Sequence, residues 1–289
     1  MNTIAQAPVT FKEILIASDL SDASASALDY TKALVRRFGA HMMLVHVSEP
    51  LARIEVPEGA WVEDNCARDA EEVETIGDAL RAEGLSVSAV NAVGSVRQEI
   101  VEIINNSPAD LVVLGTHARS GMNRFILGSY AEGVARRVSC PVLIVGPSAA
   151  PVPSESWLPK NIVCATSLDP DRVQTVSYAV ALAKSFGSRL TIVTVVDSKH
   201  PQSYEPFEEA LAGELSNEAV TYVKITDGAS NGDPGLKIAD VARASKADLL
   251  VMGAKQSHWG TSHLFPGVLA QVLAVAPCPV LTAGHTESS

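Results

Sequence analysis

The sequence contains few cysteines and no long apolar run. Four cysteines stand among 289 residues, and no two of them form a C-x-x-C pair, so a disulfide framework is not indicated. No apolar run approaches the length of about 18 residues that a membrane-spanning helix needs. The opening segment, MNTIAQAPVT, has neither a basic residue nor an apolar core, so no secretory signal is expected and the cytoplasm is the expected location.

Basic residues are also scarce. Lys and Arg number 22 against 33 Asp and Glu, which gives a net charge of −11. Non-specific nucleic-acid binding is therefore not expected, because contact with phosphates needs a basic face. An anionic small molecule remains open as a ligand where positive potential is local. The 47% apolar and 19% charged content is that of a soluble globular protein, and the length favours two domains.

The chain contains an internal repeat of about 140 residues. Three segments recur in the same order: FGAHMMLVHV (38–47) as FGSRLTIVTV (186–195), ADLVVLG (109–115) as ADLLVMG (247–253), and CPVLIVG (140–146) as CPVLTAG (278–284). The stretch between the copies, GPSAAPVPSESWLP, holds four prolines and three serines and is typical of a semi-rigid linker. We predict a first copy over residues 1–147, a linker over 148–159 and a second copy over 160–289.

Strand and helix patterns alternate within the first copy. Buried-strand or alternating patterns cover 12–18, 41–47, 86–93, 109–115 and 141–146, and helical patterns cover 22–38, 64–83, 96–106 and 129–138. This order predicts a doubly wound α/β domain, with a five-stranded parallel sheet flanked by helices and right-handed crossovers. Ligands of such sheets bind beyond the carboxyl ends of the strands, where Asp19 and Gly115 are expected.

The segment that follows Gly115 has the features of an anion site. Ser129 and Glu132 form an S-x-x-E capping box, which predicts a helix N-terminus at Ser129. Free N–H groups would then gather at Gly128, Ser129 and Tyr130, and Gly128 would let a ligand approach the backbone. Three side chains add local positive potential: His117, Arg119 and Arg124.

An ordinary structural connection explains the same residues equally well. A glycine at a strand end is common, and a capping box needs no ligand. The sequence has no G-x-x-x-x-G-K-[ST] motif, so a Walker-type loop is excluded. It also has no G-x-G-x-x-G after the first strand, so a dinucleotide-binding motif is not supported.

The whole chain resembles a tandem, two-domain member of the universal stress protein family. KEILIASDLSDASASALDYTKALVRRFGAHMMLVHV, ADLVVLGTHARSGMNRFILGSYAEGVARRVSCPVLIV and their second copies carry the resemblance. Nucleotide-binding members have G-x-x-G, nine residues and G-[ST]. Gly115, Gly128 and Ser129 match this pattern, whereas Ala118 replaces its second glycine. The resemblance implies a Rossmann-like fold of the adenine nucleotide alpha hydrolase type.

The resemblance also implies a nucleotide site in the first copy. Asp19 would lie near the ribose, and the backbone of Val45 to Val47 would contact adenine. The full candidate set is Ala17, Ser18, Asp19, Val45, His46, Val47, Leu114, Gly115, His117, Ala118, Arg119, Gly128, Ser129 and Tyr130. Two alternatives remain open: Asp19 as an acid that serves the start of the first helix, and His46 as a core residue with satisfied hydrogen bonds.

The second copy lacks several elements of this site. Gln256 stands at the second glycine position, Val268 replaces the serine, and Ser167 replaces Asp19. Pro266 removes a backbone donor where N–H groups should gather. We therefore expect the second copy to bind no ligand and to act as a structural partner of the first copy. His258 and His263 lie in a loop with no carboxylate or thiol between them, so no metal site is predicted.

The favoured function is the binding of one adenine nucleotide (ATP, ADP or AMP, with Mg²⁺ optional) in a regulatory or protective role. No nucleophile–base pair stands out near Gly115, so no catalytic residue is assigned, although slow ATP hydrolysis remains open. The alternatives are a nucleotide-free interaction scaffold and, with less support, an enzyme on a related nucleotide fold. Family members commonly pair through their last strands. We therefore expect an intramolecular pseudo-dimer, with further homodimerisation open, and neither nucleic acid nor membrane as a partner.

Overall fold

A computed structural model of the chain describes residues 8–49, 65–115, 124–152, 157–166, 173–197, 220–227, 234–253 and 267–283. The first copy contains β1 (Glu13–Ala17), α1 (Asp22–Phe38), β2 (His41–Ser48), α2 (Asn65–Ala82), β3 (Val87–Val93), α3 (Val96–Asn106), β4 (Leu111–Gly115), α4 (Arg124–Ala135) and β5 (Val142–Val145). The second contains β6 (Asn161–Ala165), α5 (Val173–Phe186), β7 (Arg189–Asp197), β8 (Val220–Asp227), α7 (Pro234–Ala244), β9 (Leu249–Gly253), α8 (Val268–Val275) and β10 (Val280–Ala283).

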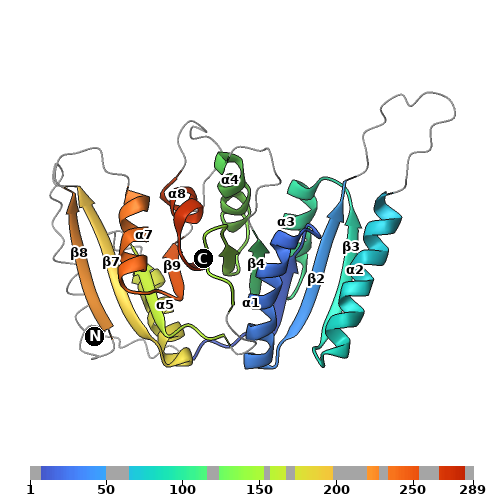
Figure 1. Cartoon of the computed structure of the whole chain (residues 1–289), viewed down its shortest axis with the longest axis horizontal. Helices are drawn as coiled ribbons and strands as arrows, with labels where there is room; N and C mark the ends of the chain where they lie inside the picture. Colours follow the sequence, from blue (N-terminus) through green and yellow to red (C-terminus); the bar gives the residue numbers. More distant parts are fainter. Residues whose placement is uncertain are drawn as a thin grey trace.

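All strands join one ten-stranded sheet in the order β3-β2-β1-β4-β5-β10-β9-β6-β7-β8. Within each copy every pairing is parallel. The copies meet where β5 and β10 run antiparallel, with Leu281 opposite Leu143. The prediction of two doubly wound α/β domains is confirmed, and Figure 1 shows the two sheets continuing into one another.

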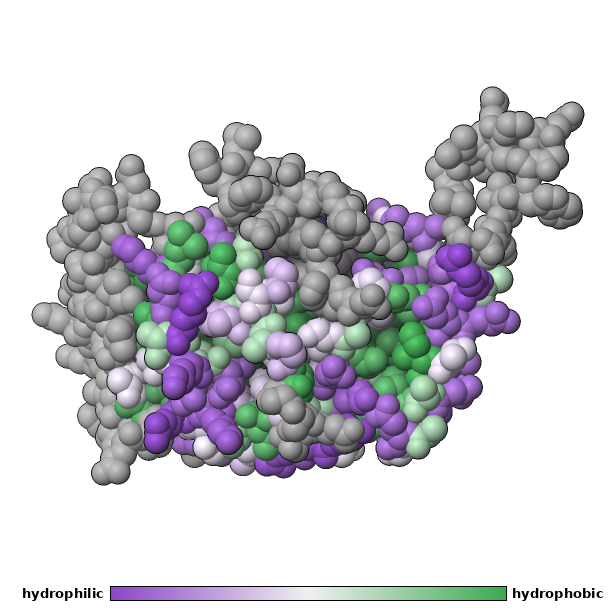
Figure 2. Space-filling view, viewed as in Figure 1, coloured by the Kyte–Doolittle hydropathy of each residue, from purple (hydrophilic) through white to green (hydrophobic). Residues whose placement is uncertain are grey.

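Helices cover both faces of the sheet. Successive residues of a strand point to opposite faces, so Ile14 and Ile16 pack into one apolar cluster with α1, α2 and α5, whereas Leu15 packs into a second with α3, α4, α7 and α8. The predicted amphipathic helix α2 has Val73 buried, and four of its acidic residues, Glu71, Glu72, Glu74 and Asp78, are exposed. Figure 2 shows the hydrophilic surface over α2. Among the described residues, no helix is both long and apolar enough to cross a membrane.

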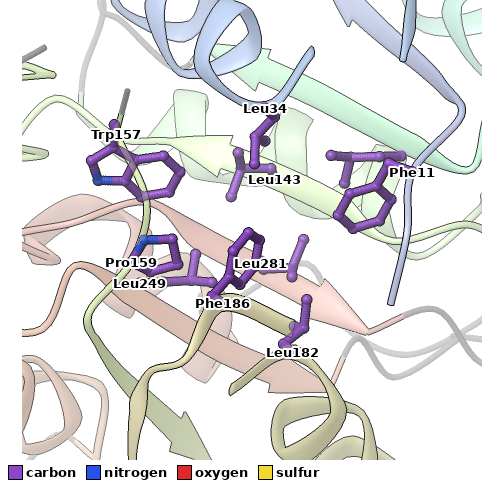
Figure 3. Close-up of a pocket in the computed structure, with 10 residues that line it drawn as sticks. Phe11, Leu34, Leu143, Trp157, Pro159, Leu182, Phe186, Leu249 and Leu281 are labelled. Atoms are coloured by element: carbon purple, nitrogen blue, oxygen red, sulfur yellow. The ribbon is translucent and has the colours of Figure 1, made fainter. Parts of the chain in front are cut away.

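An apolar recess lies where the two copies meet. It is lined by Phe11, Leu34, Leu111, Leu143, Trp157, Pro159, Leu182, Phe186, Leu249 and Leu281 (Figure 3). Several of these are repeat equivalents, such as Leu143 and Leu281. Beside them, the equivalent rings of Phe38 and Phe186 meet edge to face at 5.7 Å. The junction is therefore built from matching positions of the two copies, as approximate twofold symmetry requires.

Two equivalent tyrosines break this symmetry. The Tyr30 hydroxyl donates to the carbonyl oxygen of Ala150 at 2.7 Å, and its ring packs edge to face on Trp157 of the linker. The Tyr178 hydroxyl is buried and has no hydrogen-bond partner within the described ranges. Burial raises the pKa of Tyr30 to about 12 and also raises the pKa of Tyr178. Both hydroxyls therefore stay protonated, but in the part of the chain that the structure describes only Tyr30 has an acceptor.

All four cysteines lie in the described part of the chain, and none of them forms a disulfide there. Cys164 is fully buried, and burial raises its pKa to about 12. Burial likewise raises the pKa of Cys278 to about 12 and that of Cys140 to about 11. These three residues are therefore protonated at neutral pH and act as apolar core and junction residues.

The two tyrosines give a matched pair of substitutions. We expect Tyr30→Phe to lower the free energy of unfolding by about 0.5–1.5 kcal/mol, because a buried hydrogen bond to the linker is lost. Tyr178→Phe should be neutral or stabilising, because it removes a buried hydroxyl without a partner. Urea denaturation of both variants measures the difference, and equal losses in the two would contradict it.

Candidate functional site

Three strands bring candidate residues together at the carboxyl edge of the first sheet. Ala17, the last residue of β1, lies opposite Val45 of β2 on one side and Leu114 of β4 on the other. Gly115 follows directly at the end of β4. The strand order reverses between β1 and β4, so this row lies at the switch point where doubly wound sheets bind ligands.

The row has an apolar floor on the face covered by α3 and α4. Val45, Val47 and Leu114 are buried in one cluster, and Ala17 and Tyr130 pack against it. The Tyr130 hydroxyl lies 3.4 Å from the carbonyl oxygen of Val96, to which it donates. Burial raises the pKa of this hydroxyl to about 12. Tyr130 therefore anchors α4 to α3 beneath the edge.

Asp19 belongs to a tight turn between β1 and α1. Its Oδ1 accepts hydrogen bonds from the Ser21 N–H at 3.1 Å and from the hydroxyls of Ser21 and Ser24. Ser21 is the N-cap residue of α1 but makes no side-chain capping bond. Leu20 has a φ of 58°, in the left-handed region that non-glycine residues rarely adopt. The turn is thus held in a strained conformation by bonds to Asp19.

His46 points to the opposite face from Val45 and Val47. Its Nδ1 lies 2.8 Å from the carbonyl oxygen of Ser18, and its Nε2 lies 3.6 Å from Oδ2 of Asp69 in α2. The residue is buried, with 9% of its surface exposed. Its imidazole is therefore a bonded core group that reaches the candidate site only through Ser18.

The start of α4 corrects one prediction from the sequence. The helix begins at Arg124, five residues before the capping box would place it, so Gly128 and Ser129 lie inside α4. Glu132 does not close a capping box: its Oε1 accepts hydrogen bonds from Arg136, one turn later. In the second copy α8 begins at Val268, because a helix cannot extend far back through Pro266. No proline stands at the equivalent place in α4.

Glu132 contributes to the contact between the copies. It is 8% exposed and lies against Gly267, the N-cap of α8. A Cβ at Gly267 would stand 2.7 Å from Oε1 of Glu132 and 3.2 Å from Nη2 of Arg136. The i, i+4 spacing of Glu132 and Arg136 was a usable sequence signal for this ion pair. The contacts of His46 with Asp69 and of Asp19 with Ser24 had no such signal.

Several candidate residues lie outside the described part of the chain. In the first copy these are His117, Ala118 and Arg119; in the second they are Ser167, Gln256, His258, His263 and Pro266. Among the described residues, no group of three or more His, Cys, Asp or Glu side chains could hold a metal ion.

The geometry defines a tandem, doubly wound α/β protein with a candidate site at the switch point of its first sheet. The model of the universal stress protein family matches residues 10–146 and 159–283. The chain therefore belongs to the universal stress protein family, with two such domains in tandem.

Individual relatives agree with this assignment. A universal stress protein of Methanocaldococcus jannaschii is 30% identical over 139 residues, which cover 47% of this chain and 82% of the relative. One from Mycobacterium tuberculosis is 26% identical over 240 residues, covering 78% of this chain and 79% of the relative. The crystal structure of a universal stress protein from Archaeoglobus fulgidus matches with a TM-score of 0.72 at 20% identity, covering 96% of this chain and 97% of that one.

The contact of Glu132 with Gly267 can be tested by adding one methyl group. We expect Gly267→Ala to lower the free energy of unfolding by about 1–3 kcal/mol, because the buried carboxylate and Arg136 must move. Gly133→Ala is the control, because a Cβ there meets nothing within 4 Å and alanine favours the helix. Thermal unfolding of the two variants measures the effect. In a Glu132→Ala background Gly267→Ala should cost less; an undiminished cost there would contradict this explanation.

Proposed function

We propose that the first copy binds one adenine nucleotide at the carboxyl edge of β1, β2 and β4, in a regulatory or protective rather than catalytic role. The observation that carries this proposal is the Asp19 turn. A carboxylate is held there by two hydroxyls and a backbone N–H, beside the switch point of the sheet. A pre-oriented carboxylate suits a ribose, whose hydroxyls would donate charge-assisted hydrogen bonds to it.

The adenine and the phosphates would use different parts of the edge. The backbone around Val45 to Val47 supports an adenine position over the apolar floor. The phosphates would lie against the segment from Gly115 to Tyr130, which includes Ala118. Because α4 begins at Arg124, the N–H groups of its first turn and the positive end of its dipole belong to this segment. Mg²⁺ would accompany a bound triphosphate.

The second copy is proposed to act as a structural partner. One backbone bond recurs at the end of its first strand, since the Thr166 N–H donates to Val193 as the Ser18 N–H donates to Val45. Its sequence has Ser167 at the place of Asp19 and Val268 at the place of Ser129. The antiparallel pairing of β5 with β10 supports an intramolecular pseudo-dimer. The cytoplasm, where adenine nucleotides are abundant, is the proposed location.

Removing the Asp19 carboxylate should weaken nucleotide binding. We expect Asp19→Ala to cost about 1–3 kcal/mol, because a charge-assisted hydrogen bond to the ribose is lost. Ser167→Ala, at the equivalent position of the second copy, should leave the affinity for nucleotide unchanged. Calorimetric titration with AMP and ATP measures both the affinity and the stoichiometry, which should be one nucleotide per chain. Two equivalent sites, or an unchanged affinity in Asp19→Ala, would contradict the proposal.

The residue at position 118 should tune the preference between nucleotides. A glycine in the family's pattern indicates either a positive φ or a close approach of the backbone to the ligand. Ala118 would then cost about 1 kcal/mol or more at the phosphate end, which favours AMP or ADP over ATP. We expect Ala118→Gly to raise the affinity for ATP more than that for AMP, as measured by thermal-shift titration. Equal gains for both nucleotides would show that residue 118 does not contact the phosphates.

A further inference from the structure

His46 connects α2 to the base of the Asp19 turn. A carbonyl oxygen can only accept a hydrogen bond, so Nδ1 of His46 carries the proton that is donated to the carbonyl oxygen of Ser18. On the other side of the ring, the Asp69 carboxylate lies 3.6 Å from Nε2. The side chain of Asp69 is only 17% exposed. The imidazole is thus fixed between one helix and the residue that directly precedes Asp19.

The turn that His46 contacts needs such support. Leu20 lies in the left-handed region, and conformations of this kind persist only where surrounding contacts impose them. The Ser18 N–H donates to the carbonyl oxygen of Val45, and the Leu20 N–H to the hydroxyl of Ser18. The bond from His46 is the contact that ties the Ser18 carbonyl to a side chain of the second strand.

The second copy provides a natural comparison within the same chain. Thr194 of β7 stands at the position of His46, and its buried hydroxyl has no hydrogen-bond partner among the described residues. The backbone bond from Thr166 to Val193 is nevertheless retained. This backbone bond therefore forms without a histidine at that position. The histidine contact is missing in the copy whose sequence has lost the carboxylate, since Ser167 occupies the place of Asp19.

We propose that His46 is a positioning residue for the nucleotide site: its bond to Ser18 fixes the turn so that the Asp19 carboxylate faces the ribose. This inference rests on the nucleotide binding proposed above. It assigns His46 no contact with the ligand. It also explains why a polar side chain is kept inside a buried strand, where an apolar residue would serve packing alone.

The test compares three variants of the full-length chain in calorimetric titrations with AMP and with adenine, which has no ribose. We expect His46→Thr, the residue of the second copy, to lower the AMP affinity about three- to tenfold, the effect of one hydrogen bond, and to leave adenine binding unchanged. His46→Asn should keep most of the affinity, because its amide can donate from the place of Nδ1. His41→Thr is the control: His41 lies in the same strand but bonds to Ser86 and Ser88.

A double-mutant cycle separates positioning from general destabilisation. In an Asp19→Ala background, His46→Thr should cause no further loss of AMP affinity, because the carboxylate that it positions is gone. An equal loss in both backgrounds, or an equal loss for AMP and adenine, would overturn the inference. So would a wild-type AMP affinity in His46→Thr.

A second measurement does not depend on nucleotide. The amide hydrogens of Leu20 and Ser21 report on the turn, because they bond to Ser18 and Asp19. Hydrogen exchange followed by NMR should show them exchanging at least about tenfold faster in His46→Thr than in His41→Thr, since the turn opens more often. A wild-type chain that binds no nucleotide would refute the proposed function alone. Unchanged exchange in His46→Thr would refute the positioning role.

Discussion

The antiparallel ladder between β5 and β10 is the contact on which the rest of the molecule depends. Without it, each copy would expose β5 or β10 as an open sheet edge with unpaired N–H and C=O groups. The ladder closes both edges at once. It also brings Phe38 against Phe186 on one face of the sheet and Glu132 against Gly267 on the other. The two domains therefore form one sheet with a shared core.

The two copies share the order of strands in their half of the sheet but differ in the described polar groups at the carboxyl edge. One backbone bond directly after the first strand occurs in both, from the Ser18 N–H to Val45 and from the Thr166 N–H to Val193. The first copy adds His46, which bonds to Ser18 and approaches Asp69. The second has Thr194, whose hydroxyl bonds to none of the described residues. Duplication has thus preserved the scaffold, which depends on apolar packing, while the polar contacts around the turn have diverged.

Most of the fold could be predicted from the sequence, because it is encoded by short-range periodicity. The continuous apolar run of β2 and the spacing of apolar residues in α1 each indicated their element, and the helix over 22–38 has the predicted bounds. Because the second copy repeats the same segments in the same order, the same fold was predicted for it. The start of α4 was predicted wrongly. The S-x-x-E pattern at Ser129 marks a helix N-terminus only when the Glu132 carboxylate has no other hydrogen-bond partner. Here Glu132 accepts a hydrogen bond from Arg136.

The sequence by itself determined the repeat, the fold class and which residues would reach the carboxyl edge, since the positions of the strands along the chain and the ends of each strand follow from local patterns. It could not decide which side chains meet there. Asp69 of α2 lies against His46 of β2, and Glu132 of the first copy lies against Gly267 of the second. These contacts join residues 23 and 135 positions apart. No local pattern records them, so only the packing of helices on the sheet decided them.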